Sequence, residues 1–449
     1  MKVLLISTNR LIEPYPVYPL GLDYVTGAIS TDHQVKIADM NTVQDHASLG
    51  AIIRGFGPDV IGISLRNIDT ADTTDPKGFI EECRELIKTI KDCSHVMLVC
   101  GGSGFTMFPE AILNATKADC GIIGEGERFP LMLEALEHGK DVAEIPGVIT
   151  RHSGKPIPDP WDKLPIRDFN KEDSHLHFYL KKGGTLNLQT KRGCNLNCIY
   201  CSYPHIEGRD LRCFPPKEVA ETALKLQEAG ARYLFITDSA FNSDISHSMA
   251  VAQAFKKAGV TVPWGAFFAP IKLPDNYFRI MADAGLTHVE FSTEALSDVM
   301  LKSYGKPFLS NHVFEAHNNA LDAGLYVAHY LMLGGPKESA DTLNETFSNI
   351  SKLKKTVLFF FCGVRIYPHT KLYDMALKKG IISKSANMLK PVFYQPTSID
   401  NYEIIHRVEE QAEKHVNWIV GSGGEKTSKV VSMMHRRGYS GPLWELLIR

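Results

Sequence analysis

Three cysteines stand close together in the stretch KRGCNLNCIYCSYP, at Cys194, Cys198 and Cys201. Cysteine thiolates bind zinc and iron, and a structural zinc site usually takes its four ligands as two separated pairs. No second pair follows nearby, because Cys213 and Cys362 stand alone and are more often small buried apolar residues. The spacing favours a [4Fe–4S] cluster held by three thiolates, whose fourth iron can bind another molecule.

The cysteines follow a strand-like segment, GTLNLQT (184–190), and Tyr200 precedes the last of them. This pattern, Cys-x3-Cys-x-aromatic-Cys, resembles the hallmark of the radical SAM enzymes. The resemblance implies that the fourth iron binds the amino and carboxylate groups of S-adenosylmethionine. One electron from the cluster then cleaves this cosubstrate to a 5′-deoxyadenosyl radical. An electron donor such as flavodoxin or ferredoxin is therefore an expected partner.

Residues 181–375 are expected to form the family's (βα)6 partial TIM barrel, because strand–helix units of about 30 residues end in its motifs, with the chemistry at the carboxyl ends of the strands. Four stretches resemble barrel strands with their loops: 217–244, 287–296, 326–339 and 364–374, the last taken as the final strand. The resemblance assigns cosubstrate contacts to Tyr200, Asp238, Ser292, Glu294, Gly334, Gly335, Arg365 and Tyr367.

Several of these assignments have structural alternatives. Glu294 matches a ribose-binding carboxylate, which can accept two hydrogen bonds from vicinal hydroxyls, but it could instead pair with Lys306 or Lys302. Asp238 stands in DSAFN, where many members carry Gly-Gly-Glu, and this departure leaves its role open. Arg365 lies in an apolar segment and needs an anionic partner, either the cosubstrate carboxylate or a structural acid.

Residues 1–150 alternate buried strand patterns with helical patterns, which predicts a doubly wound, Rossmann-like α/β domain with a parallel sheet. Ligands of such sheets bind at the carboxyl ends of the strands. The glycine turns CGGSGFT (100–106) and GEGE (124–127) follow two of these strands, although turns alone are the simpler explanation. The spacing G-x-G-x-x-G is absent there, so a dinucleotide site is weakly supported.

A doubly wound domain in front of this barrel resembles the cobalamin-binding branch of the radical SAM enzymes. An Asp-x-His-x-x-Gly signature, whose histidine would replace the lower base, is absent, as is common in this branch. The loop 64–70 is then expected to face the cobalt from below, with Arg66 or Asn67 either holding a water or lining the site. The resemblance assigns cobalamin contacts to four groups of residues: Ser7, Thr8, Leu20, Gly21; Ser64, Leu65, Arg66; Gly101, Gly102, Ser103, Gly104; Gly124, Glu125, Gly126, Glu127.

Residues 151–180 are polar and proline-rich and are interpreted as a connector between domains. Residues 376–449 are expected to form a small, mostly helical extension. Within it, 401–420 has the apolar stripe of a helix, 421–429 is interpreted as a turn, and the closing GPLWELLIR as a segment docked on the barrel.

Composition limits the function classes. The chain has 449 residues and a formal net charge of −2, so it has no electrostatic footprint for nucleic acid. No apolar run of about 18 residues predicts a membrane span. Nine cysteines without a secretory signal indicate reduced thiols and a cytoplasmic location. Cys83, Cys93, Cys100 and Cys120 lack chelating spacing, which argues against the second cluster of methylthiolating relatives.

The predicted function is therefore hydrogen abstraction from an unactivated carbon followed by methyl transfer from methylcobalamin. The alternative within the branch is ring-forming or carbon-skeleton chemistry without methylation. The substrate is expected to be a small molecule, and the aromatic stretches 264–270 and 357–363 hint at a lipid-like one. Three other classes remain: a cobalamin carrier, a zinc-stabilised binding module, and a radical SAM enzyme that binds no cobalamin.

Overall fold

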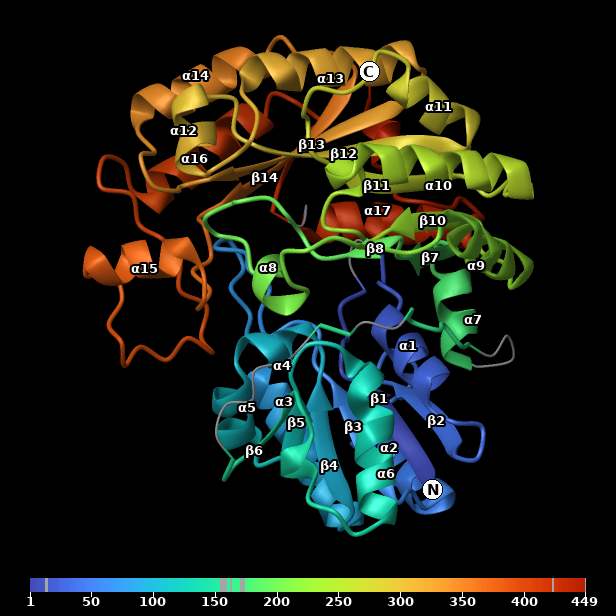
Figure 1. Ribbon diagram of the computed structural model, residues 1–449. Helices are drawn as coiled ribbons and strands as arrows, with labels where there is room; N and C mark the ends of the chain where they lie inside the picture. Colours follow the sequence, from blue (N-terminus) through green and yellow to red (C-terminus); the bar gives the residue numbers. More distant parts are fainter. Residues whose placement is uncertain (13–14, 154–159, 162–163, 170–173, 422–423, 449) are drawn as a thin grey trace. The chain divides into compact units, whose positions relative to one another are not determined.

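The computed structural model describes residues 1–449 except 13–14, 154–159, 162–163, 170–173, 422–423 and 449 (Figure 1). The described residues form two compact units. Unit 1 contains most of residues 1–179, and unit 2 contains residues 180–449. Unit 2 also includes 71–76, a short segment from within the N-terminal third of the chain.

Unit 1 is built on a six-stranded sheet in the order β2-β1-β3-β4-β5-β6, as expected for a doubly wound domain. Strands β1 to β5 run parallel and β6 is antiparallel to β5. Their near-continuous apolar residues are buried because helices cover the sheet. The strands are β1 (Lys2–Ser7), β2 (Gln34–Asp39), β3 (Val60–Ser64), β4 (Met97–Gly101), β5 (Cys120–Ile122) and β6 (Val148–Thr150).

Helices α1 and α6 share one apolar core with the sheet of unit 1, whereas α2, α3 and α5 pack against one another. Local sequence sets their ends: the Asp45 side chain caps α2 by accepting from Ser48 N, and Gly57 ends it in the left-handed conformation, φ +62°. The helices are α1 (Leu20–Ala28), α2 (His46–Phe56), α3 (Ile80–Cys93), α4 (Ser103–Met107), α5 (Pro109–Thr116) and α6 (Phe129–Glu137).

The expected connector, 151–180, is not irregular throughout. Its last residues begin helix α7 (Ser174–Lys181), and the residues up to Tyr179 pack within unit 1. The Tyr179 hydroxyl donates to Asp39 Oδ2 at 2.6 Å, and the His175 ring stacks on Tyr18. Residues 154–159, which include two of the connector's prolines, lie outside the described part.

Unit 2 is built on a seven-stranded parallel sheet in the order β15-β14-β13-β12-β11-β10-β7, which forms the partial barrel. Six of these strands, β7 and β10 to β14, form the (βα)6 unit. The strands are β7 (Thr185–Leu188), β10 (Tyr233–Ile236), β11 (Trp264–Phe268), β12 (Leu286–Glu294), β13 (Tyr326–Leu333), β14 (Thr356–Cys362) and β15 (Trp418–Val420).

Helices lie along the outside of the barrel sheet (Figure 1). Every second strand residue, such as Leu331 and Phe360, joins a core with these helices, and the intervening residues face the inside. The helices are α9 (Pro216–Glu228), α10 (Ile245–Ala258), α11 (Tyr277–Asp283), α12 (Asp298–Ser303), α13 (Ser310–Asp322), α14 (Ala340–Ile350), α15 (Lys371–Lys378), α16 (Asn401–Ala412) and α17 (Gly424–Arg436).

Three expectations about the C-terminal part were wrong. The final (βα)6 strand is β14, and 364–370 follows it as an irregular segment that makes only an isolated bridge between Arg365 and Phe393. The expected helix over 401–420 ends at Ala412, and its last residues form β15, which extends the sheet beside β14. The expected turn over 421–429 contains the start of α17, with 422–423 outside the description. In each case, tertiary pairing and packing overrode the local pattern.

The tail segment GPLWELLIR does dock on the barrel. Trp444, in the 3₁₀ helix η4 (Trp444–Leu447), packs against Ala328, Val357 and Ile419 inside the sheet. Its indole nitrogen donates to Glu290 Oε1 at 3.1 Å. The C-terminal residues therefore fill one end of the barrel interior.

Glu290 gives this packing a pH dependence. Burial raises the pKa of Glu290 to about 7, against hydrogen bonds from Trp444 and Tyr330 that lower it. A carboxyl group with a raised folded-state pKa stabilises the fold below its unfolded pKa, about 4.5, and loses that contribution as pH rises through 7.

We expect wild-type unfolding free energy to fall by about 2–3 kcal/mol more than that of Glu290→Gln between pH 5 and pH 8. Urea unfolding measures this difference, and identical pH profiles would contradict it. The exposed Glu221, varied to Gln, is the control and should keep the wild-type profile.

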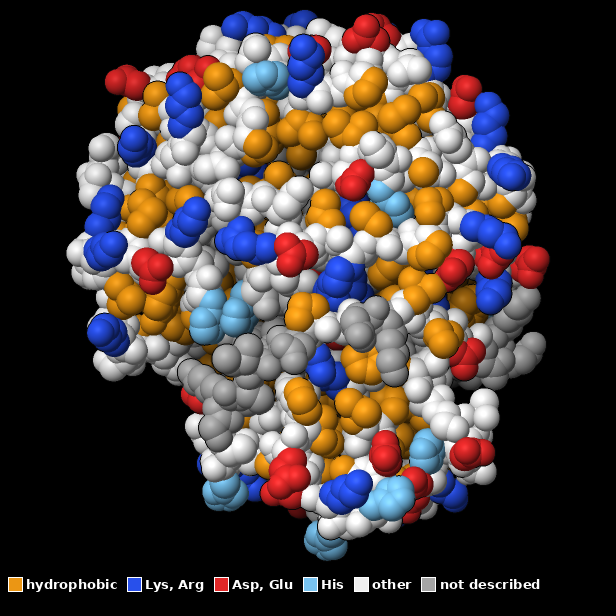
Figure 2. Space-filling model, viewed as in Figure 1, with side chains coloured by type: hydrophobic (Ala, Val, Ile, Leu, Met, Phe, Trp, Pro, Cys, Tyr) orange, Lys and Arg blue, Asp and Glu red, His pale blue; other side chains and the backbone are white. Residues whose placement is uncertain are grey.

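No helix within the described ranges is long and apolar enough to cross a membrane. On the face seen in Figure 2, Lys and Arg side chains are interspersed with Asp and Glu, in keeping with the small net charge.

Candidate functional site

The three cysteines lie on the loop that follows β7. A short antiparallel pair, β8 (Lys191–Arg192) and β9 (Arg212–Cys213), closes the base of this loop, and helix α8 (Tyr203–Ile206) lies within it. Gly193 has φ +89°, and a Cβ there would clash with the Asp210 carbonyl oxygen. Only glycine fits this turn into the first cysteine. Cys194 N then donates to Gly208 O at 3.1 Å, which fixes the loop in place.

The thiols are gathered in a shielded space. Cys194 is buried, and Cys198 and Cys201 are half-buried. Burial, together with the neighbouring Cys198 and Cys194 thiols, raises the pKa of Cys201 to about 12. This donor set fits a cubane, because its three thiolates bind three different irons, whereas tetrahedral zinc needs its ligands around one point.

A buried lysine links the cluster loop to the end of β12. Lys306 Nζ lies 2.6 Å from Glu294 Oε2, hydrogen-bonds the Cys198 side chain, and stands 5.5 Å from the Tyr200 ring centroid. Glu294 sits at a register shift that ends β12, with φ +57°. Of the two interpretations of Glu294, the structure contains the pairing with Lys306; ribose binding stays a prediction.

The same region includes the glycine turn after β13. Tyr304 makes an edge contact with the Tyr200 ring at 5.6 Å, and its hydroxyl donates to Met332 O at 2.7 Å. A Cβ on Gly335 would clash with the Tyr304 ring, and Gly334 has φ +92°. The turn is therefore tightly packed beside the cluster loop. The predicted residues Tyr200, Glu294, Gly334 and Gly335 are brought together here.

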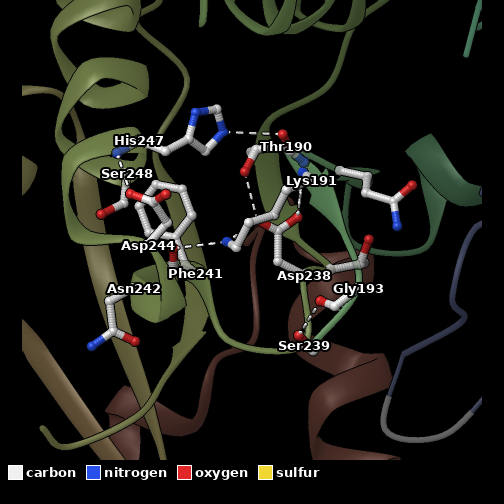
Figure 3. A network of polar contacts seen from close by, with 12 residues as sticks. Thr190, Lys191, Gly193, Asp238, Ser239, Phe241, Asn242, Asp244, His247 and Ser248 are labelled. Atoms are coloured by element: carbon white, nitrogen blue, oxygen red, sulfur yellow. Dashed lines mark hydrogen bonds and ion pairs between the residues drawn. The ribbon is translucent and has the colours of Figure 1, made fainter. Parts of the chain in front are cut away.

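Asp238 occupies a different position (Figure 3). Its carboxylate accepts from Thr190 N at 2.8 Å, from Thr190 Oγ1 at 2.5 Å and from Lys191 Nζ at 2.8 Å, and it is 2% exposed. Lys191 Nζ also donates to Phe241 O at 2.9 Å. The next residue, Ser239, donates to Gly193 O at 3.2 Å. Asp238 thus fastens the loop after β10 to the entry of the cysteine loop, which is a positioning role; its predicted cosubstrate contact remains a prediction.

The other predicted cosubstrate residues are spread further. Ser292 is half-buried on the inner face of β12. Arg365 is buried, and its guanidinium donates to the carbonyl oxygens of Ile366, Met388 and Val392. Backbone carbonyls therefore supply acceptors where an anion was expected. The Arg365 guanidinium lies over the Tyr367 ring, with 4.9 Å between its Cζ atom and the ring centroid.

Lys191 and Thr190, which hold the Asp238 carboxylate beside the cysteine loop, were not identified from the sequence. The available signal was a basic residue directly before the cysteine motif in an otherwise strand-like stretch. Its partner is 47 residues away and could not be identified from spacing.

In unit 1, the predicted cobalamin loops meet at the carboxyl edge of the sheet. Thr8 Oγ1 donates to Ser64 O at 2.9 Å, and Ser103 Oγ donates to Arg66 O at 2.9 Å. Gly102 has φ +96°, and a Cβ there would lie 2.6 Å from Leu65 O. The loops after β1, β3 and β4 are thus locked together. The remaining predicted residues lie in the first turn of α1 (Leu20, Gly21) and around the 3₁₀ helix η1, Gly126–Arg128 (Gly124, Glu125, Gly126, Glu127).

This edge has room for a bound group. A Cβ on Gly101, at the end of the central strand β4, or on Gly21 would meet nothing within 4 Å. Open space beside Gly101 at the strand end, and beside Gly21 in the first turn of α1, would allow a large planar ligand to approach the backbone closely. The residues present therefore fit cobalamin.

We expect Gly101→Leu to lower hydroxocobalamin affinity roughly tenfold, because its side chain enters the open space at the strand end. The melting temperature should stay unchanged, since nothing is displaced. Equilibrium titration followed by corrin absorbance measures the affinity. Gly55→Leu is the control, because this exposed glycine in α2 also borders open space. Equal affinities of Gly101→Leu and the control would place the ligand elsewhere.

Comparison with known proteins agrees with a cluster site in unit 2 and a cobalamin site in unit 1. The model of the radical SAM superfamily matches residues 188–350, and that of the B12 binding domain matches residues 13–131. An uncharacterized methyltransferase from Pyrococcus horikoshii is 25% identical over 400 residues, covering 85% of this chain and 84% of the relative. Cytidylyl-2-hydroxyethylphosphonate methyltransferase from Streptomyces wedmorensis is 23% identical over 467 residues, covering 85% and 86%.

A solved structure has the same fold over nearly the whole chain. The radical S-adenosylmethionine methyltransferase TsrM from Kitasatospora setae superposes with a TM-score of 0.90 at 19% identity, covering 99% of this chain and 97% of TsrM. TsrM has also been solved with cobalamin and a [4Fe-4S] cluster bound. The α/β fold of this chain is therefore that of TsrM.

Proposed function

This chain belongs to the cobalamin-binding radical SAM enzymes, and we propose that it transfers a methyl group to a carbon atom of a small-molecule substrate. The observation that carries the proposal is the joint presence of two sites. One is the shielded three-thiol loop at the carboxyl end of the barrel strands, and the other is the open, glycine-lined edge of the sheet in unit 1. The methyltransferases similar to this chain along most of its length support methyl transfer over carbon-skeleton chemistry.

The cofactors are a [4Fe–4S] cluster, S-adenosylmethionine and cobalamin. When bound, the cluster and S-adenosylmethionine supply a radical that abstracts hydrogen, and cobalamin supplies the methyl group. Cys194, Cys198 and Cys201 would hold the cluster. The loops of Ser64–Arg66, Gly101–Gly104 and Gly124–Glu127 would hold cobalamin.

The chain's own residues provide placement and shielding. The Lys306 ammonium neutralises Glu294 and donates to the Cys198 sulfur, so both groups keep fixed positions in a buried environment. The ion pair of Lys191 with Asp238 fixes the start of the cysteine loop. Such pre-positioning favours the reaction, because a radical and its substrate must be aligned and water must be kept out of the site.

The proposal includes flavodoxin or ferredoxin as the source of the electron and a cytoplasmic setting. The composition supports this setting, because nine cysteines in a chain of this length, without the paired spacing of a disulfide framework, are typical of proteins with reduced thiols.

The test uses the full chain purified without oxygen and reconstituted with iron, sulfide and hydroxocobalamin. We expect about four irons per chain together with corrin absorbance. Trideuteromethyl-labelled S-adenosylmethionine and a fractionated small-molecule extract should then give a product that has gained the label, detected by mass spectrometry. Iron without corrin would exclude cobalamin chemistry. Both cofactors with a changed but unlabelled product would favour ring-forming or carbon-skeleton chemistry instead.

A further inference from the structure

The side chains on the inner face of the barrel sheet are more deeply buried at the amino end of the strands than at the carboxyl end. At the amino end, the inward residues Tyr233, His288, Glu290, Ala328 and Val357 are buried. The C-terminal tail closes this end: Trp444 donates to Glu290, and Glu445 Oε2 lies 3.1 Å from His288 Nε2. No ligand could enter the barrel from this side without displacing the tail.

Toward the carboxyl end, the inward residues keep part of their surface exposed. Phe267, Ser292, Tyr330, Phe359 and Phe361 are all half-buried, although their outward neighbours on the same strands are buried. Ser292, Tyr330 and Phe359 are direct register partners on adjacent strands. The barrel interior is therefore accessible from the end at which the cysteine loop and Glu294 lie.

Four of the half-buried side chains on this surface are aromatic, and we call them the aromatic wall: Phe267, Tyr330, Phe359 and Phe361. The Tyr330 ring is nearly parallel to Phe359, at 4.7 Å and 12°, and to Phe361, at 6.2 Å and 10°. Phe267 meets Tyr330 edge-on at 5.4 Å and 73°. The wall thus combines ring faces in one orientation with one ring at a steep angle to them.

The tail holds the wall in place. The Tyr330 hydroxyl hydrogen-bonds Glu290, which Trp444 contacts from the closed end. A tyrosine ring fixed at its hydroxyl and stacked on its neighbours has little freedom to turn. The wall is consequently rigid and needs little ordering when a ligand binds.

We infer that the substrate presents a planar aromatic ring system to the aromatic wall. Rigid rings in parallel and edge-on orientations favour another aromatic ring through stacking and edge contacts, in addition to the burial of apolar area. A flexible alkyl chain would gain only the burial. This inference rests on the proposed function, because it names the substrate class of the same site, and it replaces the lipid-like substrate that the aromatic stretches suggested.

The test compares two probes of equal ring skeleton, 2-naphthol and its saturated counterpart decahydro-2-naphthol, by calorimetric titration of the reconstituted full chain. We expect 2-naphthol to bind roughly tenfold more tightly, which corresponds to the upper range of an aromatic pair's extra energy. Equal affinities, or no 2-naphthol binding up to its solubility limit, would overturn the inference.

Variants locate the effect. Phe361→Leu should reduce the preference for 2-naphthol to roughly threefold or less, because leucine keeps apolar area but not the ring. Phe314→Leu, a half-buried phenylalanine on α13, is the matched control and should keep the wild-type ratio. An unchanged ratio in Phe361→Leu would also overturn the inference. Iron and corrin content are measured in the same samples. Wild-type protein that binds neither iron nor corrin counts against the proposed function. Equal affinities of the wild type for the two probes, or an unchanged ratio in Phe361→Leu, with iron and corrin both retained, count against the aromatic wall alone.

Discussion

We expect Lys191→Met to lower the free energy of unfolding of unit 2 by about 3–5 kcal/mol. Lys191 and Asp238 are both essentially inaccessible to solvent, with side chains 0% and 1% exposed. Removing the ammonium leaves the Asp238 carboxylate buried with no cationic partner, held only by the Thr190 donors and the backbone N–H of residue 191. An unpaired charge in the interior costs far more than the loss of an exposed ion pair. Urea unfolding followed by circular dichroism measures the change.

Lys217→Met is the matched control, because Lys217 forms an ion pair with Glu221 on the exposed face of α9, with 88% and 53% of the two side chains exposed. This variant should lose at most about 0.5 kcal/mol. The double variant with Lys191→Met and Asp238→Asn should recover part of the loss, since no charge remains buried. A single Lys191→Met variant as stable as Lys217→Met would show that water reaches the Asp238 site.

The second large effect is on metal content. Cys198→Ala should reduce reconstituted iron from about four per chain to near zero and abolish activity, because a cubane loses one of its three protein ligands. Iron analysis and the visible spectrum measure this without a substrate. Cys194→Ala and Cys201→Ala should behave in the same way.

Cys213→Ala is the control for these variants, because Cys213 is exposed and lies at the base of the same loop, in β9. It should keep full iron content. A Cys198→Ala variant that keeps its iron would remove Cys198 from the ligand set. One tightly bound zinc in wild-type protein would instead support the zinc-stabilised binding module.

The cysteine motif and the two-domain α/β fold follow from local sequence features. The three cysteines lie within eight residues, so their spacing alone is enough to identify them as ligands of one cluster. Most strands of both units are apolar runs bounded by turns. This local pattern is enough to predict a buried parallel strand. The meeting of the loops after β1, β3 and β4 was also predictable, because the carboxyl ends of parallel strands lie at one edge. Their contact with cobalamin stays a prediction.

Features that depend on distant partners were not predictable. β15 has three residues and forms because β14 offers it an open edge, which a local helical pattern cannot reveal. Arg365 found its acceptors in backbone carbonyls, which carry no sequence signature. For Asp238, the sequence suggested a ligand contact, whereas its partners Thr190 and Lys191 are set by the pairing of β10 with β7.

The sequence by itself therefore determined which cofactor chemistry this protein contains, because three thiols and an aromatic residue within eight positions suffice to specify a cluster site. Tertiary structure alone decided how that site is held and what it can accept. Lys306 reaches Cys198 and Glu294 only through folding, and the aromatic wall exists only because strands far apart in sequence align their inward residues. The physical reason is that charge pairing and ring stacking depend on distances in space, which residue order does not encode.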